Sequence, residues 1–291
     1  MKPSTFLIAS ILLLSCNASS QEAGVLQEQE VYKEIMGQAL TADIFYTSET
    51  LERRGNPAIA FFHGGGWAFG TPAEFHNACR RYAKKGFVTF SFDYRLSIQE
   101  DGRFPHPDIT PVECVKDARS AVRWLKAHAD TWHVDPEKVI VSGQSAGGQL
   151  ALSTALIDHV NEKTDNLEID PTPRALLLYA SNLNTMEAWA DYLLGERREE
   201  IWSISPYHNL KPGMPPVIEF HSRADPVVDF YTVEFFMQKT RAMGNRFEQV
   251  PFEGKGHYLA KGDTTYAEYF DESVMERTDS FLEELGLMPD R

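Results

Sequence analysis

Cysteine and positive charge are both scarce in this sequence, and each shortage excludes a class of protein. Three cysteines in 291 residues are too few for a disulfide-stapled scaffold. Lysine and arginine total 28 against 42 aspartates and glutamates, which gives a net charge of −14. Because this charge repels a phosphate backbone, we expect no nucleic-acid partner. Hydrophobic residues make up 43% of the chain and charged residues 24%, a mixture typical of a folded globular protein.

Long apolar runs are missing as well. The longest candidate, residues 6–14, is too short to cross a bilayer as a mature helix. It follows Lys2 and precedes small residues, a pattern typical of a secretory signal peptide. We therefore expect an exported protein, located in the cell envelope, the periplasm or the medium.

Two processing sites compete at the end of this apolar run. Leu13-Leu14-Ser15-Cys16 is similar to a bacterial lipobox, which predicts removal of residues 1–15 and attachment of lipid to Cys16. Ala18-Ser19-Ser20 would suit ordinary signal peptidase. We favour the lipobox because Cys16 follows the apolar run directly. The prediction is then a membrane tether over residues 16–24.

Motifs for metals and nucleotide cofactors are also missing. The sequence has no H-E-x-x-H, no C-x-x-C, no P-loop and no G-x-G-x-x-G after a strand. We therefore expect neither a metal nor a cofactor.

From residue 25 onward, patterns typical of strands and helices alternate, which predicts a single domain over residues 25–291. This alternation indicates an α/β fold, with a mostly parallel sheet covered by helices on both faces. Residues 181–215 are the least regular stretch, and we expect them to form a cap-like insertion. The expected strands are residues 25–31, 40–46, 58–62, 87–92, 138–142, 175–179, 216–220 and 247–252, with helices at 72–85, around 115–129, from about 146, at 232–243 and at 272–285.

The main chemical motif is Gly143-Gln144-Ser145-Ala146-Gly147, which is G-x-S-x-G. It follows an apolar strand and precedes a helical pattern, the context that a nucleophile elbow requires. Its glycines allow the sharp turn that lifts a serine hydroxyl above a sheet. A glycine-rich turn with a serine helix cap is the alternative interpretation, but the strand-turn-helix context favours Ser145 as nucleophile.

A serine nucleophile needs a base, and the base needs an orienting carboxylate. In this architecture the chain order is serine, acid, histidine. His257, in a loop after the last strand, is the expected base. Asp225 follows the preceding strand and is favoured over Asp229, which falls where a helix begins. His221 lies nearby within the strand end, where we expect a packed or wall histidine.

The oxyanion of an acyl-transfer intermediate needs preorganised donors. His63-Gly64-Gly65-Gly66-Trp67 follows the third strand, and its glycines can present backbone N–H groups without side chains in the way. We expect Gly64, Gly65 and the N–H of Ala146 to form this oxyanion hole, with His63 anchoring the loop. Trp67 and Gln144, beside the loop and the serine, are the expected substrate-binding residues.

Together these motifs resemble those of the α/β-hydrolase fold. Within that fold they resemble the hormone-sensitive-lipase-like group of bacterial acetyl esterases and related carbohydrate esterases, and the resemblance covers nearly the whole chain after residue 25. It implies an eight-stranded sheet, a Ser145–His257–Asp225 triad and the oxyanion hole named above. The motifs that carry the likeness are the glycine loop, Asp93-Tyr94-Arg95-Leu96, Gly143 to Gly148, Asp225 and His257.

The resemblance also implies structural roles for other residues. Arg95 is expected in an ion-pair network below the site, with Asp117 as its partner. Cys79 and Cys114 are expected on opposite faces of the sheet and therefore unpaired. Two features depart from the group. Gln144 stands where an aspartate usually precedes the nucleophile, and no N-terminal helical cap precedes the first strand.

The leading interpretation is a serine hydrolase of short-acyl carboxylic esters, acting on small esters or on acetyl or feruloyl groups of carbohydrates. Trp67 and one of Trp189 or Trp202 are the expected pocket walls, although packing of the insertion is an alternative role for each. Two other functions remain open. A serine exopeptidase could use the same triad, although such peptidases usually carry a large gating domain. A non-catalytic binding protein of the same fold is the third candidate.

Overall fold

The computed structural model describes residues 24–253, 256–259 and 272–289. The expected signal peptide of residues 1–15, Cys16 and nearly all of the expected tether lie outside the described residues. Within the described part, no helix is both long enough and apolar enough to pass through a bilayer.

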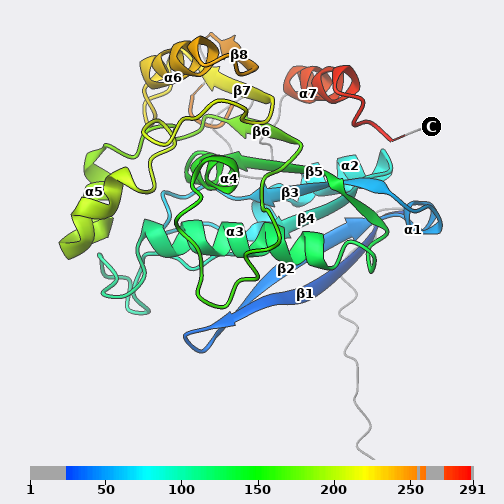
Figure 1. The fold of residues 1–291 in the computed structure, drawn as a ribbon, viewed down its shortest axis with the longest axis horizontal. Coiled ribbons are helices and arrows are strands. Elements are labelled where there is room, and N and C mark those ends of the chain that lie inside the picture. The colour runs from blue at the N-terminus through cyan, green and yellow to red at the C-terminus, as the bar shows by residue number, and fades with distance from the viewer. Residues whose placement is uncertain (1–23, 254–255, 260–271, 290–291) are drawn as a thin grey trace, which may run out of the picture.

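The centre of the molecule is an eight-stranded sheet with the order β1-β2-β4-β3-β5-β6-β7-β8 (Figure 1). The first two pairings, β1 with β2 and β2 with β4, are antiparallel, and the others are parallel. The expected fold is therefore confirmed. The strands are β1 (Leu26–Ile35), β2 (Gln38–Tyr46), β3 (Asn56–Phe62), β4 (Val88–Phe92), β5 (Val134–Gln144), β6 (Ala175–Tyr179), β7 (Val217–Ser222) and β8 (Phe247–Phe252).

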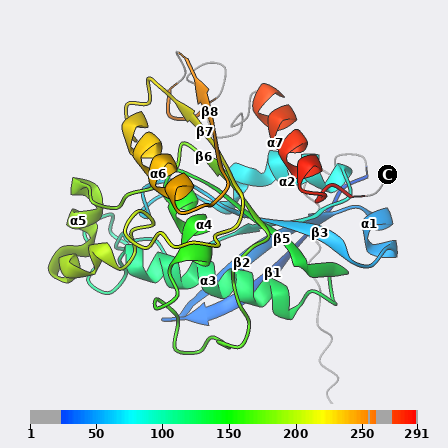
Figure 2. The same cartoon turned by 45° about the horizontal axis from the view of Figure 1, so that its top comes forward.

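Helices cover both faces of this sheet. Apolar residues of α3, α4 and α6 pack in one core layer, and those of α2 and α7 pack in the other. Figure 2 shows α2 and α7 together on one side of the sheet. The helical elements are α1 (Ser48–Glu52), η1 (Pro72–Phe75), α2 (His76–Lys84), α3 (Pro111–Ala127), α4 (Ala146–Leu156), α5 (Ala188–Leu194), η2 (Gly195–Trp202), α6 (Phe230–Ala242) and α7 (Glu272–Glu284).

The two buried cysteines lie in these separate layers. Cys79 belongs to α2 and Cys114 to α3, and both are free thiols. They occupy opposite faces of the sheet, as expected.

Local sequence explains most element boundaries. Every residue of β3 is buried, which fits its apolar composition in the middle of a parallel sheet. The capping box of Thr71 and Glu74 starts the expected helix, whose first turn is the 3₁₀ helix η1. Several boundaries differ from those expected, among them the ends of β1 and the starts of β3 and α6, and the largest change in interpretation concerns β5. We expected a turn at 134–137, whereas β5 begins at Val134, because this residue pairs with Asn56 of β3.

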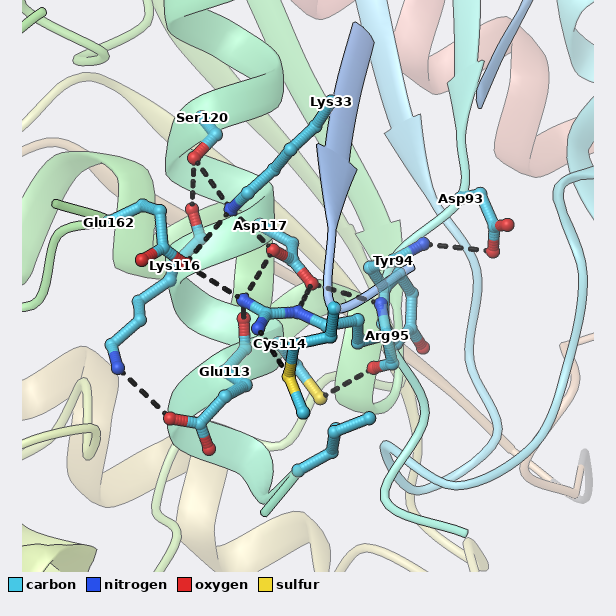
Figure 3. A network of polar contacts seen from close by, with 12 residues as sticks. Lys33, Asp93, Tyr94, Arg95, Glu113, Cys114, Lys116, Asp117, Ser120 and Glu162 are labelled. Carbon is cyan, nitrogen blue, oxygen red and sulfur yellow. Dashed lines mark hydrogen bonds and ion pairs between the residues drawn. The ribbon is translucent and has the colours of Figure 1, made fainter. Parts of the chain in front are cut away.

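The expected ion pair of Arg95 and Asp117 is confirmed. Both side chains are buried, and the Arg95 Nε lies 2.7 Å from Asp117 Oδ2. Lys33 of β1 contacts the other oxygen of Asp117 at 2.6 Å, and Glu162 contacts both cations (Figure 3). Buried charges are tolerated only when paired in this way. The network therefore fixes the segment after β4 against α3.

This fixed segment supports the glycine loop after β3. The Tyr94 hydroxyl lies 3.0 Å from the carbonyl oxygen of His63 and 3.2 Å from that of Gly64. The Ser97 N–H donates to the carbonyl of Trp67 at 2.8 Å. The insertion at residues 181–215 contains α5 and η2, and its Trp189 indole donates to the Gly66 carbonyl at 2.9 Å. Both flanks of the loop are thus held in place.

Candidate active site

Ser145 is the single residue between the end of β5 and the start of α4. Its backbone has φ 54° and ψ −119°, a conformation that costs a non-glycine residue free energy and that clusters at functional sites. The neighbouring glycines permit the turn. A Cβ on Gly143 would lie 2.1 Å from the Gly147 carbonyl oxygen, and one on Gly147 would lie 2.1 Å from that of Phe62. The strained serine expected from G-x-S-x-G is therefore present.

Asp225 and His257 contact each other directly. His257 Nδ1 donates to Asp225 Oδ2 at 2.8 Å, while Asp225 Oδ1 accepts the N–H groups of Val227 at 2.8 Å and Val228 at 3.0 Å. Burial raises the pKa of the Asp225 carboxyl, but hydrogen bonds from His221 and His257 more than offset it and hold that pKa well below its ordinary value. Asp225 is thus an anion, and Nε2 of His257 is the nitrogen available to take a proton.

Asp229 has a different role. It is the N-cap of α6, and its side chain accepts the Tyr231 N–H at 2.9 Å. A carboxylate here stabilises the start of the helix. The expectation that Asp229 belongs to the helix, and that Asp225 is the partner of the histidine, agrees with this geometry.

The glycine loop is tightly packed around the serine. A Cβ on Gly64 would lie 2.0 Å from Gln144 Oε1, and one on Gly65, where φ is +106°, would lie 2.2 Å from the Phe69 carbonyl oxygen. Only glycine fits at position 65, where both the backbone conformation and the Phe69 backbone exclude a side chain, whereas a side chain at position 64 would have to displace the end of the Gln144 side chain. Ala146 directly follows Ser145 as the first residue of α4. The three residues expected to form the oxyanion hole therefore lie at the ends of β3 and β5, which are neighbouring parallel strands.

His63 anchors the loop, as expected. It is fully buried, its ring stacks on that of Tyr94 with a centroid distance of 4.2 Å, and its Nδ1 donates to the Gly64 carbonyl at 2.8 Å. Burial lowers the pKa of His63 to about 4, against a smaller opposite effect of the Gly64 hydrogen bond. The side chain is neutral at pH 7 and acts as a structural support.

A pocket of about 280 Å³ joins these groups. Ser145 and His257 both line it, together with Gly65 and Ala146 of the expected oxyanion hole. The lining residues are Gly65, Gly66, Trp67, Phe69, Gln144, Ser145, Ala146, Asn182, Glu187, Trp189, Val227, Val228, His257 and Tyr258. Among the residues that the structure describes, no group of three or more His, Cys, Asp or Glu side chains is arranged to hold a metal ion.

The expected substrate-binding residues differ in their exposure. Trp67 and Gln144 line the pocket, but Trp67 is only 1% exposed and its indole donates to Gln149 Oε1 at 2.9 Å. The Trp67 side chain is therefore mainly a packed residue, and its indole N–H is bonded inside the protein. Trp189 also lines the pocket while bonding the glycine loop. Trp202 is 53% exposed and absent from the pocket lining, so of the two tryptophans offered as a wall it is Trp189 that lines the pocket.

Two polar residues of the pocket were missed by sequence reasoning. Glu187 and Asn182 come from the insertion, and the Asn182 amide donates to Glu187 Oε1 at 3.0 Å. Burial raises the pKa of Glu187, and the Asn182 hydrogen bond opposes that rise. No motif marks either residue, because their position depends on how the insertion folds back over the sheet.

Comparisons with known proteins agree with this geometry. Residues 42–177 match the model of the BD-FAE family. The chain resembles the solved structure of esterase 2 from Thermogutta terrifontis, with a TM-score of 0.80 and 33% identity, over 91% of this chain and 94% of that one. It is also 23% identical to the esterase LipC of Mycobacterium tuberculosis over 72% of this chain. Both of these proteins are described as esterases.

The curated relatives are longer proteins. The chain spans 55% of the mycobacterial esterase and 21% of lipase 2 from a Moraxella species, with which it shares 33% identity over 34% of its own length. The likeness to the Thermogutta esterase instead extends over almost the full length of that protein. On this likeness, and on the sheet and elbow described above, the chain belongs to the α/β-hydrolase esterases.

Proposed function

We propose that this protein is a serine hydrolase of short-acyl carboxylic esters. The observation that carries the proposal is the 2.8 Å contact of His257 with the buried Asp225, in a pocket that His257 shares with the strained Ser145. Ser145 Oγ attacks the acyl carbon, and His257 Nε2 takes the proton and passes it to the leaving alcohol. Water then attacks the acyl-enzyme by the same route, releasing the acid and restoring the serine.

The developing oxyanion is stabilised by backbone donors. In the proposed mechanism these are the N–H groups of Gly64, Gly65 and Ala146, which the glycine loop and the start of α4 supply. Donors fixed in advance need no reorganisation as charge develops, which is why such groups contribute strongly to rate. The buried contacts of the His63 ring with the Gly64 carbonyl and of the Tyr94 hydroxyl with the His63 carbonyl hold the glycine loop in place.

The size of the pocket supports a short acyl group. A space of about 280 Å³ must hold the acyl group and part of the alcohol. Structures of the Thermogutta esterase are described with propionate and with butyrate bound. Both ligands are short carboxylates, in keeping with a small acyl site here.

For p-nitrophenyl esters of increasing acyl length, we expect kcat/KM to be highest with acetyl or propionyl and to fall from butyryl onward. Each further CH₂ adds about 0.8 kcal/mol of binding only where space exists, and clashes where it does not. We also expect no activation at a lipid interface. A maximum at octanoyl or longer would contradict the short-acyl assignment.

The pocket lining also supports a polar alcohol group such as a sugar, and hence acetyl groups on carbohydrates as substrates; a feruloyl group is larger than butyryl and does not fit the short-acyl proposal. Asn182 and Glu187 place an amide and a carboxylate beside Ser145, where they can bond hydroxyl groups. A simple alkyl or aryl ester makes no use of these groups.

Glu187→Ala should therefore lower kcat/KM for deacetylation of acetylated xylan by about tenfold, the effect of losing one hydrogen bond to a charged group. The value for p-nitrophenyl acetate should change much less. Glu196→Ala is the matched control, since Glu196 is an exposed carboxylate of the same insertion outside the pocket. Equal losses on both substrates would argue against a sugar-binding role.

We further propose that the protein is exported and tethered through a lipid on Cys16. The support is the signal-like segment before this cysteine. Wild-type protein expressed in a bacterial host should then partition with membranes, and Cys16→Ala should either release it or leave its signal uncleaved. The measurement is fractionation with mass spectrometry of the mature N-terminus. An unlipidated N-terminus at Gln21 would contradict the tether and favour ordinary signal peptidase.

A further inference from the structure

Three ionisable side chains meet at the carboxyl end of β7. Glu219 and His221 belong to the strand and Asp225 to the turn after it, and all three side chains are 0% exposed. The strand is paired on both sides, with β6 and β8. Two carboxylates buried this close together would be costly without a cation between them.

The contacts of His221 define where its protons lie. Nε2 lies 2.9 Å from the Val228 carbonyl oxygen and 3.2 Å from Asp225 Oδ2. Both atoms are acceptors, so Nε2 must carry a hydrogen. On the other side, Nδ1 lies 3.0 Å from Glu219 Oε1, an oxygen that also accepts the Ser181 N–H at 2.9 Å. An ionised Glu219 therefore accepts a hydrogen bond from Nδ1–H, and a ring that carries hydrogens on both Nδ1 and Nε2 is an imidazolium.

The two carboxylates on either side of His221 favour this state over the effect of burial. Burial lowers the pKa of His221, but the hydrogen bonds with Asp225 and Glu219 outweigh it and raise this pKa to about 10. The nearby cation is Arg223, which stacks on the Phe230 ring at 4.5 Å, and that ring lies 6.0 Å from the His221 ring. His257 lies beyond Asp225.

Asp225 is consequently held from four directions. Its Oδ1 accepts two backbone N–H groups, of Val227 and Val228, and its Oδ2 lies between two imidazoles, those of His221 and His257. Such a carboxylate has little freedom to rotate or to take up a proton.

We propose that His221 is a positioning residue for the reaction: as an imidazolium anchored by Glu219, it keeps Asp225 ionised and oriented toward His257. This inference rests on the proposed function, because the proposed ester hydrolysis is what makes the orientation of Asp225 toward His257 matter for the reaction. His221 itself does not touch the substrate pocket, since it is absent from the lining. It acts only through Asp225.

The charge on His221 can be measured without any activity assay. In protein labelled with ¹⁵N-histidine, spectra are recorded about two pH units above the ordinary histidine pKa. We expect both ring nitrogens of His221 to be protonated there, with the assignment taken from the signals lost in His221→Asn. An unprotonated ring nitrogen at this pH would overturn the proposal. This result stands even if the protein has no esterase activity.

A double-mutant cycle tests whether His221 acts through Asp225. We expect His221→Asn to lower kcat for p-nitrophenyl acetate by about 10- to 100-fold with little change in KM, and to have almost no further effect in an Asp225→Asn background. His76→Asn is the control, because His76 makes a 2.8 Å contact with Asp43 away from the pocket. If His221→Asn lowered kcat by the same factor in the wild-type and the Asp225→Asn backgrounds, the two residues would act independently, and the proposal would be overturned.

If His221→Asn does not fold, Glu219→Gln provides the second variant. Its amide can still bond Nδ1 of His221, but the ring loses the anion that holds its second proton. A thermal melt checks the fold, and we expect kcat to fall with KM unchanged. Wild-type kcat in folded Glu219→Gln would overturn the proposal. If Asp225→Asn itself retained full ester hydrolysis, the proposed function would fail, whereas the spectra would still decide the charge of His221.

Discussion

Ser145→Ala is expected to lower kcat/KM for p-nitrophenyl acetate by about four orders of magnitude or more, while the protein stays folded. The serine supplies the attacking oxygen, and the remaining groups of a triad cannot replace it because they act as one unit. The alanine should not disturb the elbow, since its neighbours Gly143 and Gly147 provide the close approach of strand and helix. The measurement is steady-state hydrolysis with circular dichroism as the fold check.

Ser203→Ala is the matched control. Ser203 lies in the insertion, bonds the Glu200 carbonyl and is absent from the pocket lining. Its removal should leave kcat/KM within a few-fold of wild type. Substantial activity in purified, folded Ser145→Ala would mean that another group carries the reaction.

The second large effect is expected for Asp225→Asn, with a loss in kcat of about 10⁴-fold. The amide of asparagine can donate a hydrogen to Nδ1 of His257, which moves the ring proton to Nε2. A protonated Nε2 cannot accept the proton of Ser145. The shape of the side chain is retained, so the loss reports the tautomer of His257. A pH profile of kcat in both proteins is the appropriate measurement.

Asp229→Asn provides the comparison for this variant. Asparagine caps helices as well as aspartate does, so both α6 and activity should be retained. If Asp229→Asn abolished activity and Asp225→Asn did not, the assignment of the acid would be wrong.

Much of the fold and the candidate site could be predicted because the signals are local. The glycines around Ser145 mark a turn that a Cβ would obstruct. This constraint can be predicted from the five residues of the G-x-S-x-G motif alone. Asp229 could be separated from Asp225 because a helix start has its own pattern. The apolar run of β3 is likewise typical of a strand buried on both faces.

The remainder depends on contacts between distant segments. Glu187 and Asn182 reach the pocket only because the insertion folds over it, and Trp202 stays exposed for the same reason. The early start of β5 depends on Asn56, from another strand. His221 appeared to be an ordinary packed histidine, because the sequence does not show that Glu219 and Asp225 contact opposite sides of its ring.

The most direct test of the central claim is to trap the acyl-enzyme. Wild-type protein turning over p-nitrophenyl acetate is quenched in acid, digested and mapped by mass spectrometry. We predict one acetyl group on the peptide that contains Ser145, formed in a burst of p-nitrophenol and missing from Ser145→Ala. Hydrolysis without acetylation of Ser145, or no hydrolysis of any short-acyl ester by the folded protein, would contradict the proposed function.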